Sequence, residues 1–427
     1  MWVVNFSALT WAPATVKFAR DTGRNARNPL TMTTVTLDHV PRIVQGAGAL
    51  GSIGTLVKEL AAPGGLSGLR GPGRLQGPVL LVADPGLRDT GMIDSARAAL
   101  REAGLGVVLF EDVKSDPTMA QVDAAATLAR REKATAVVSM GGGSALDVGK
   151  TVAAICGGEA GASHYGLCAN PFPKRTVANV CIPTTSGTGS ETTRTAVLGD
   201  AHHAKIWLWG DEIKADLVVL DPVLTTGLPA HLTAATGVDA LVHAIEAATN
   251  ANANAANNLY CHEAIRLVVK HLRRAVEKPA DVEARGGVQW AATLAGIAID
   301  NGGTAIAHNI GHALASLRPI HHGRVVGLAL RATLPWNIEN DEGWYAAVAA
   351  AMGESANATK LPGAFDRLVR DVGIKVSLSG EGHDDITPEQ LAAQMARPEN
   401  SAMRRSNRRP VADADLLHFA QLMLTER

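Results

Sequence analysis

The stretch ATAVVSMGGGSALDVGK (134–150) decides the fold class, because a β-branched run leads into three glycines and then into a helical pattern. A strand that ends in glycines and continues as a helix is the repeating unit of parallel sheets. Sheets of this kind bind ligands at the carboxyl ends of their strands. The glycines at 141–143 are therefore the first candidate for a ligand site.

The same alternation of strands and helices continues on both sides of this unit. Further strands are expected at 78–86, 106–113, 176–185 and 214–222. Helices are expected at 94–104, with Asp94 as N-cap, and at 120–133. After Asp221 the strand pattern stops, and Ala-rich helical periodicity continues to the C-terminus. Helix breaks are expected near Pro279, Gly302, Pro319, Pro335 and Pro362.

This pattern predicts an N-terminal α/β dinucleotide-binding domain, with a parallel sheet flanked by helices, followed by an all-α C-terminal domain. The 427 residues suffice for both, since single cores rarely exceed about 250 to 300 residues. We assign 32–222 to the first domain and 223–427 to the second. The Gly-, Pro- and Arg-rich stretch 62–78 is expected to be a surface insertion, and we assign it no function.

Residues 1–31 are treated as an extension of uncertain structure. They carry four basic residues and lack a compact apolar block that ends in a cleavage site, so they do not resemble a secretory signal. Two interpretations stay open, a basic organellar transit peptide and a translation start at Met32.

Composition favours an enzyme that acts on small molecules in the cytoplasm. The 40 basic and 41 acidic side chains nearly cancel, which gives no general attraction to nucleic acid or anionic lipid. No apolar run reaches the roughly 18 residues of a membrane span. The four cysteines are widely spaced without a CxxC pair, as expected in a reducing compartment. We therefore expect neither a nucleic-acid nor a membrane partner.

Glycine-rich segments in two places could bind a phosphate. In GGGSALDVGK (141–150), backbone N–H groups and a helix N-terminus are suited to a pyrophosphate, although Ser144 and Asp147 also fit a helix cap without a ligand. GAGALG (46–51) matches G-x-G-x-x-G but precedes the expected βα units, so we interpret it as a turn.

Two further features belong to the same expected sheet edge. PTTSGTGSETT (183–193) offers N–H and O–H donors that could surround phosphate or ribose, with a low-complexity linker as the alternative. Asp84, after the strand at 78–86, could accept hydrogen bonds from a ribose 2′-OH and repel a 2′-phosphate. A plain turn aspartate is the alternative.

Histidines and carboxylates recur at helical spacing in the second half of the chain. Asp239 and His243 are four residues apart, and Glu246 follows. His308 and His312 repeat that spacing, and His322 lies beyond an expected turn. One carboxylate with two or three imidazoles suits a first-row divalent ion such as Fe²⁺ or Zn²⁺, with one position left open.

With these motifs the chain resembles the iron-containing (group III) alcohol dehydrogenases. The resemblance extends over most of residues 40–425 and rests on GGGSALDVGK, IPTTSGTGSETTRTAV, LDPVLTTGLPAHLTAATGVDALVHAIEA, AHNIGHALA and HHGRVVGLAL. It implies a dinucleotide-binding α/β domain, a helical metal-binding and substrate domain, and an active site in the cleft between them.

The resemblance also assigns site residues. The implied metal ligands are Asp239, His243, His308 and His322. His312 is the implied histidine near nicotinamide and substrate, a candidate proton carrier, whereas His321 stands where the family often has proline and is taken as a neighbour. The implied cofactor-binding residues are Asp84, Asp116, Gly142, Gly143, Ser144, Asp147, Thr184, Thr185, Thr188 and Lys205. Trp207 and Trp209 depart from the less aromatic surroundings that this lysine usually has.

The predicted function is interconversion of an alcohol and an aldehyde or ketone by hydride transfer, as an NAD-dependent enzyme of class EC 1.1.1.-. Two cofactors are expected. The nucleotide is NAD rather than NADP, and the metal is Fe²⁺, although Zn²⁺ or another divalent ion fits the same donors. The resemblance implies a homodimer or a larger homo-oligomer.

Alternatives remain in the same architecture and outside it. A polyol dehydrogenase, a hydroxyacid–oxoacid transhydrogenase or a dehydroquinate synthase-like enzyme would share these motifs. From other classes, a metal-dependent hydrolase would need no dinucleotide loop, and a non-catalytic nucleotide-binding scaffold would lack the metal. Binding of NADH would distinguish the dehydrogenase from the hydrolase, and a bound metal would distinguish it from the scaffold.

Overall fold

The computed structural model describes residues 35–60, 77–202, 204–339, 341–379, 383 and 385–425. From Thr36 onward the described residues belong to one compact unit. The expected extension 1–31 lies outside the described residues, and so do residues 62–76 of the expected insertion. The predicted division into two domains at residues 222 and 223 stays a prediction.

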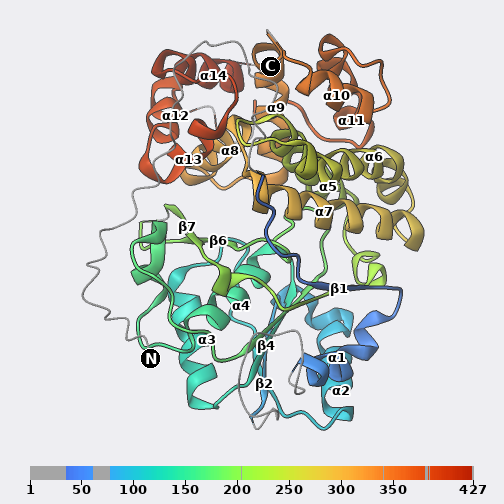
Figure 1. Ribbon diagram of the computed structural model, residues 1–427, viewed down its shortest axis with the longest axis vertical. Coiled ribbons are helices and arrows are strands. Elements are labelled where there is room, and N and C mark those ends of the chain that lie inside the picture. Colours follow the sequence, from blue (N-terminus) through green and yellow to red (C-terminus); the bar gives the residue numbers. More distant parts are fainter. Residues whose placement is uncertain are drawn as a thin grey trace, which may run out of the picture. The chain divides into compact units, whose positions relative to one another are not determined.

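Six parallel strands form the sheet of the α/β part, in the order β1-β8-β5-β4-β2-β3 (Figure 1). Their bounds are β1 Arg42–Gln45, β2 Val79–Ala83, β3 Val107–Phe110, β4 Ala136–Gly141, β5 Ala178–Pro183 and β8 Leu217–Leu220. β2, β4, β5 and β8 are buried along their whole length. Their continuous apolar runs follow from burial on both faces, which is typical of parallel sheets.

Helices cover both faces of this sheet, at α1 Ile53–Leu60, α2 Met92–Glu102, α3 Met119–Arg131 and α4 Gly143–Ile155. Alternate residues of β2 point to opposite faces. Leu81 packs in the core that contains residues of α1 and α2, and Leu80 in the core that contains residues of α3 and α4. The predicted parallel sheet flanked by helices is confirmed.

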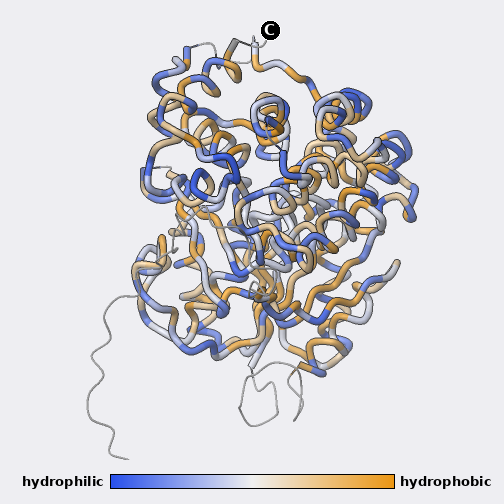
Figure 2. The backbone as a smooth tube through the Cα atoms, turned by 45° about the horizontal axis from the view of Figure 1, so that its top comes forward, coloured by the Kyte–Doolittle hydropathy of each residue, from blue (hydrophilic) through white to orange (hydrophobic). Residues whose placement is uncertain are grey.

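After β8, helices make up the rest of the described chain, together with short 3-10 turns. Their bounds are α5 Ala230–Thr249, α6 Ala255–Glu277, α7 Val282–Gly302, α8 Ile306–Leu317, α9 His322–Asn337, α10 Trp344–Ala351, α11 Leu361–Asp371, α12 Pro388–Met395, α13 Ser401–Ser406 and α14 Asp413–Thr425. Hydrophobic and hydrophilic stretches alternate along most of them (Figure 2). Helix α5 is buried from Thr233 to Thr249, as expected for a helix that is apolar nearly all round.

An antiparallel hairpin, β6 Thr195–Gly199 and β7 Lys205–Trp209, was not expected from the sequence. Its strands are short, and the sequence DAHHA (200–204) between them contains no turn signal of the usual two-residue kind. No helix in the described ranges is both long and apolar enough to cross a membrane. The four cysteines are all free thiols.

One expectation about local helix structure is wrong. Helix α2 begins at Met92 after Gly91, so Asp94 lies in its first turn and is not the N-cap. A carboxylate there still interacts favourably with the helix dipole. Helix α9 ends at Asn337, two residues after Pro335, so the expected break near Pro335 is confirmed.

The basic stretch 396–409 contains a 3-10 turn at Pro398–Asn400 and helix α13. Arg408 stacks over Trp344 at 4.3 Å, and Arg409 over Trp336 at 3.7 Å. Arg408 also donates to the carbonyl oxygens of Thr249 and Asn250. These partners lie up to 159 residues away in sequence, so local composition could not reveal them.

Candidate active site

Three helices bring the predicted metal ligands together. Asp239 and His243 lie one turn apart on α5, His308 lies in the first turn of α8, and His322 is the first residue of α9. Each of the four side chains offers one donor atom, and these four atoms all lie within 4.8 Å of one another. Asp239, His243 and His308 are buried, and the His322 side chain is 38% exposed. The spacing seen in sequence therefore corresponds to a single cluster in space.

The distances inside this cluster fit a shared ion better than hydrogen bonds. Asp239 Oδ1 lies 3.8 Å from His243 Nε2, 3.7 Å from His308 Nε2 and 3.6 Å from His322 Nε2. Two donors on a tetrahedral ion with bonds of about 2.1 Å lie about 3.4 Å apart. The buried Asp239 Oδ1 and His308 Nε2 have no hydrogen-bond partner among the described residues. Buried polar atoms of this kind need a partner, and a divalent ion is one that these donors accept.

Burial and mutual charge set the protonation of the cluster. Burial lowers the pKa of His243 and of His322 to about 4, so both imidazoles are neutral donors near pH 7. Burial opposes ionisation of Asp239, but His243 and His322 together hold the pKa of its carboxyl well below the ordinary value. Burial opposes protonation of His308, but Glu246 and Asp239 raise its pKa to about 9, so an ion that binds this imidazole must displace a proton. The ionised carboxylate and the two neutral imidazoles are donors that a divalent ion requires.

His312 and His321 flank the cluster without belonging to it. The ring centroid of His312 lies 5.3 Å from that of His322 and 6.3 Å from that of His308. Burial lowers the pKa of His312 well below its usual range. His321 is the exposed N-cap of α9 and is outside the set of converging donors.

The glycine loop at the end of β4 lies against the hydroxyl-rich loop at the end of β5. Thr184 donates its N–H to Gly141 O at 2.9 Å. A Cβ added to Gly142 would lie 3.4 Å from the Thr185 side chain, and one added to Gly143 would lie 2.7 Å from Thr188 Cγ2. The absence of side chains at these glycines is therefore what lets the two loops approach. Gly142 and Gly143 form the N-terminus of α4, whose N–H groups favour an anion.

Other polar groups of the glycine motif are used inside the protein. The N-cap of α4 is Gly142, so the helix cap by Ser144 and Asp147 that the sequence left open is absent. Ser144 donates to Ser115 O at 2.6 Å. Asp147 accepts from Ser190 Oγ at 2.5 Å and from Val197 N at 2.9 Å. Ser144 and Asp147 thus connect α4 to neighbouring loops.

Lys150, the last residue of the motif, is a structural residue that the sequence reasoning did not single out. It is fully buried, and its Nζ donates to the carbonyl oxygens of Ser190, Thr193 and Thr195. One ammonium with three carbonyl acceptors fixes the end of the hydroxyl-rich loop. Its signal in the sequence was its position one turn after Asp147, on the helix face that meets the loop.

The other predicted cofactor residues lie at the same edge of the sheet or face it. Asp84 follows β2, accepts from Gly86 N at 2.9 Å and would contact a Cβ added to Gly141 at 2.8 Å. Lys205, the first residue of β7, forms an ion pair with Asp116. The positive charge of Lys205 also lowers the pKa of His312 and of His322. Burial and the neighbouring histidines lower these pKa values more than Lys205 does.

The hydroxyl-rich loop also packs directly against the helices of the metal cluster. A Cβ added to Gly187 would lie 2.6 Å from Thr236 on α5, one turn before Asp239, and one added to Gly189 would lie 2.4 Å from Gly296 on α7. Glu191, buried at 3% exposure, accepts from Thr293 on α7 at 2.8 Å. The loop that faces the glycines of α4 is therefore in backbone contact with the helix that carries two of the predicted ligands.

The GAGALG turn (46–51) is a correction to the sequence analysis, because it does lie inside a βα unit, between β1 and α1. Its amides are nevertheless occupied by the protein itself. Gly48 N and Leu50 N donate to the two carboxylate oxygens of Asp221 at 3.0 and 3.1 Å. The interpretation as a turn without a ligand is compatible with this geometry.

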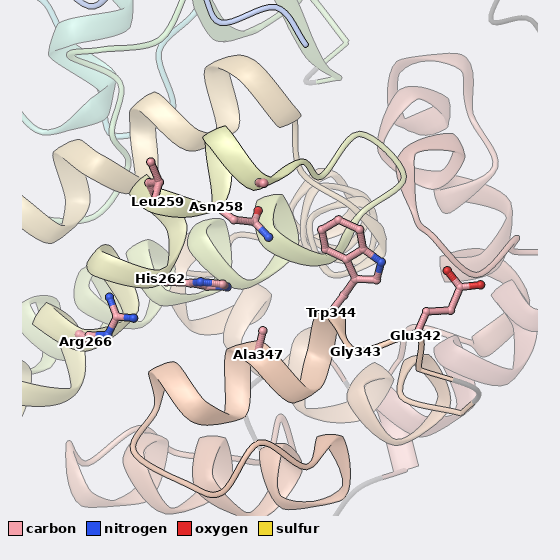
Figure 3. A pocket seen from close by; sticks show the side chains of 9 residues that line it. Asn258, Leu259, His262, Arg266, Glu342, Gly343, Trp344 and Ala347 are labelled. Carbon is pink, nitrogen blue, oxygen red and sulfur yellow. The ribbon is translucent and has the colours of Figure 1, made fainter. Parts of the chain in front are cut away.

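A pocket on the surface lies apart from the predicted residues (Figure 3). It opens between α6 and the start of α10, and its lining includes Leu259, His262, Arg266 and Trp344. None of the predicted metal or cofactor residues is among its lining residues. The pocket therefore has no part in the site described above.

Comparisons with known proteins agree with this geometry. The family model described as iron-containing alcohol dehydrogenase matches residues 41–222, and that of the C-terminal part of the Fe-containing alcohol dehydrogenase family matches 233–421. The NAD-dependent methanol dehydrogenase of Bacillus methanolicus is 32% identical over 331 residues, which cover 77% of this chain and 83% of the relative. The 1,3-propanediol dehydrogenase of Klebsiella pneumoniae is 33% identical over 349 residues, covering 78% and 89%.

Solved structures give the same result. A 1,3-propanediol oxidoreductase has a TM-score of 0.81 at 29% identity, covering 91% of this chain and 100% of that one. A sulfoacetaldehyde reductase from Bifidobacterium kashiwanohense, in complex with NAD⁺, has a TM-score of 0.81 at 25% identity, covering 93% and 100%.

The chain therefore belongs to the iron-containing alcohol dehydrogenase family, and the predicted resemblance is confirmed. It is a metal-dependent, NAD(H)-linked oxidoreductase that interconverts an alcohol and a carbonyl compound, with NAD and Fe²⁺ as cofactors. This finding sets aside the non-redox hydrolase and the non-catalytic scaffold.

Proposed function

We propose that Asp239, His243, His308 and His322 are the ligands of the divalent ion in this enzyme, and that its substrates are short alcohols and the corresponding aldehydes. The observation that carries the ligand proposal is the convergence of four donors on one buried point, with Asp239 Oδ1 and His308 Nε2 lacking other partners. The substrate proposal is supported by the relatives, which are named for methanol and 1,3-propanediol.

The cofactor is proposed to lie along the edge formed by the ends of β2, β4 and β5. Gly142 and Gly143 offer N–H groups at the N-terminus of α4 for the pyrophosphate, and Thr184, Thr185 and Thr188 face them from the other loop. Ser144 and Asp147 are proposed to hold the loops in place, since their side chains bond within the protein.

Asp84, Asp116 and Lys205 complete the proposed cofactor set. Asp84 stands beside Gly141, where a carboxylate would accept from a ribose hydroxyl and repel a 2′-phosphate, which favours NAD over NADP. Lys205 forms an ion pair with Asp116, and its charge acts on His312 and His322 beside the metal ligands.

The metal supplies Lewis-acid polarisation of the substrate oxygen when it is bound. The residues of the chain then have three tasks. Asp239 and the three histidines would fix the ion, and the two loops would hold the nicotinamide end of the cofactor in reach of the substrate. The close packing of the hydroxyl-rich loop on α5 and α7 would limit the access of water. This placement would bring the substrate carbon that gives or receives the hydride next to the nicotinamide.

His312 is proposed to carry the proton between substrate and solvent. It lies beside the cluster, on the same helix as His308. Because burial holds its pKa well below the usual range, the ring is neutral and has a nitrogen lone pair that can accept a proton and pass it on. For H312A we expect kcat lower by about 100-fold with unchanged metal content. Turnover equal to that of the wild type over pH 6 to 9, with fold and metal intact, would reject this role.

We also propose that the enzyme works in the cytoplasm as a homodimer or larger homo-oligomer. The free thiols of all four cysteines support a reducing compartment. β1 is an edge strand of the sheet, and Leu37 and Val40 just before it are 41% and 39% exposed, which supports pairing with a second copy. Light scattering of the purified protein measures the assembly.

The experiment for the proposed function is metal analysis of protein purified without oxygen, followed by NADH oxidation against a panel of short aldehydes. We expect close to one bound Fe²⁺ per chain and turnover that requires it. Full activity in protein free of divalent ions would contradict the proposed ligands and their role together.

A further inference from the structure

Glu246 stands one turn after His243 on α5, and neither the sequence analysis nor the proposed ligand set gives it a task. Its carboxylate is 3% exposed. A buried carboxylate is costly unless it is fully hydrogen-bonded, so its partners identify its function. All three partners recorded in the described part of the chain lie at the start of α8.

The first two partners are backbone amides. Glu246 Oε2 accepts from Ala305 N at 2.9 Å, and Oε1 accepts from Ala307 N at 2.7 Å. Helix α8 begins after Ala305, which has no side chain that can cap it. The first N–H groups of a helix need acceptors, and a negative charge at this end is favourable. Glu246 therefore caps α8 from another helix.

The third partner is His308 itself. Its Nδ1 lies 2.6 Å from Glu246 Oε2. Because a carboxylate only accepts, Nδ1 of this imidazole carries a proton, which leaves Nε2, 3.7 Å from Asp239 Oδ1, as the nitrogen available to an ion. One carboxylate thus fixes both the position of α8 and the tautomer of the histidine that α8 carries.

The C-terminal end of helix α5 also binds the turn that precedes α8. Asn250 Nδ2, one turn beyond Glu246, donates to Gly302 O and Gly303 O, each at 2.9 Å, and Asn252 Nδ2 donates to Gly302 O. These bonds fix the link between α7 and α8 to the C-terminal end of α5. Helix α5 therefore carries Asp239 and His243 and also sets the register of His308 against them.

We infer that Glu246 is a positioning residue of the metal centre, which orients His308 and docks α8 so that three ligands from two helices meet at one point. The inference rests on the proposed ligand set. A carboxylate behind a ligating histidine raises its basicity and fixes its ring, and loss of such a group typically weakens metal binding by about 10- to 100-fold.

The test is Co²⁺ binding to metal-free protein, followed by visible absorption and by competition with a chelator, in wild type, E246Q and E191Q. Gln retains the size of Glu but presents an NH₂ group to a site that contains only donors. Glu191 is the matched control, because it is equally buried at 3% exposure and bonds Thr293 rather than a ligand. We expect about 10- to 100-fold weaker Co²⁺ binding and an altered absorption spectrum in E246Q only.

A second variant separates positioning from simple helix capping. In A305S/E246Q, the serine hydroxyl restores a local cap to α8. We expect this double variant to recover thermal stability but not Co²⁺ affinity. If E246Q alone does not fold, Co²⁺ binding is measured on the double variant instead. Wild-type affinity in either variant, or an equal loss in E191Q, would overturn the inference. Failure of the wild type to bind Co²⁺ would instead overturn the proposed ligand set.

Discussion

Two buried clusters of ionisable groups differ in what balances their carboxylates. Asp300, 1% exposed at its side chain, meets cations of the protein, since Lys214 Nζ lies 2.6 Å from its Oδ2 and Arg194 Nε 3.6 Å from its Oδ1. The basic neighbours of Asp239 among the described residues are three imidazoles, at distances beyond a hydrogen bond. A buried charge needs compensation. Cations of the chain compensate the charge of Asp300, and we interpret the Asp239 cluster as a site where a bound metal ion provides the compensation.

The two glycine turns differ in the same way. The amides of the turn at 46–51 are occupied by the Asp221 carboxylate, so this turn is closed by the protein. Gly142 and Gly143 begin α4 without a side-chain cap, and the loop that faces them carries the hydroxyl groups of Thr185 and Thr188. Sequence composition does not separate the two turns, but the presence of an internal carboxylate does.

The largest effect is expected from removing a proposed ligand. We expect D239N and H308A to lose the bound metal and at least about 1000-fold in kcat/KM, because Lewis-acid catalysis is worth several kcal/mol. Metal analysis and NADH oxidation measure both. The control is H321A, which changes the exposed neighbour of His322 and should retain metal and activity. Metal loss in H321A with retention in H322A would reverse the assignment of these two histidines.

Asp300 should behave as a structural residue. We expect D300N to lower the free energy of unfolding by about 3 kcal/mol, since it leaves buried cations without their partner, with unchanged metal content in the folded protein. Urea denaturation gives the first quantity and metal analysis the second. D211N is the control, because Asp211 pairs with the same Arg194 at the surface and should cost less than about 1 kcal/mol. Metal loss in D300N would remove the distinction between the clusters.

The glycine turns can be compared by adding a methyl group to each. G143A should raise KM for NADH by about 10-fold, because the new Cβ would lie 2.7 Å from Thr188 Cγ2 and displace the facing loop. T188S removes that methyl group and should restore KM in the double variant. G46A meets nothing within 4 Å and should leave KM unchanged. Equal effects of G143A and G46A would contradict the proposed cofactor loop.

The smallest effect is expected at Asp84. D84N retains an oxygen that can accept from Gly86 N but removes the negative charge, so use of NADPH relative to NADH should rise by about 10-fold or less. Steady-state kinetics with both cofactors measures the ratio. An unchanged ratio, with KM for NADH also unchanged, would place the adenosine ribose elsewhere.

Much of the fold could be predicted because it depends on local patterns. The buried strands read as continuous apolar runs, and Asp239 and His243 were paired by helical spacing alone. The assignment of His322 rather than His321 came from the resemblance. The structure brings His322 into the set of converging donors and leaves His321 exposed.

The parts that sequence reasoning missed depend on distant partners. Glu246 was visible in the motif, but its role as cap and orienting group requires α8, about 60 residues later, to begin beside it. Arg408 and Arg409 stack over tryptophans that lie far away in sequence, so local composition does not reveal these contacts. The Asp221 carboxylate that closes the turn at 46–51 lies 171 residues from Leu50.

Reversible removal of the metal shows whether turnover depends on the ion. Wild-type protein is treated with a chelator until no divalent ion remains, assayed for NADH oxidation with a short aldehyde, and assayed again after addition of Fe²⁺ without oxygen. The account predicts activity that disappears with the metal and returns with it, while NADH binding persists throughout. Activity that survives complete removal of the metal would contradict it.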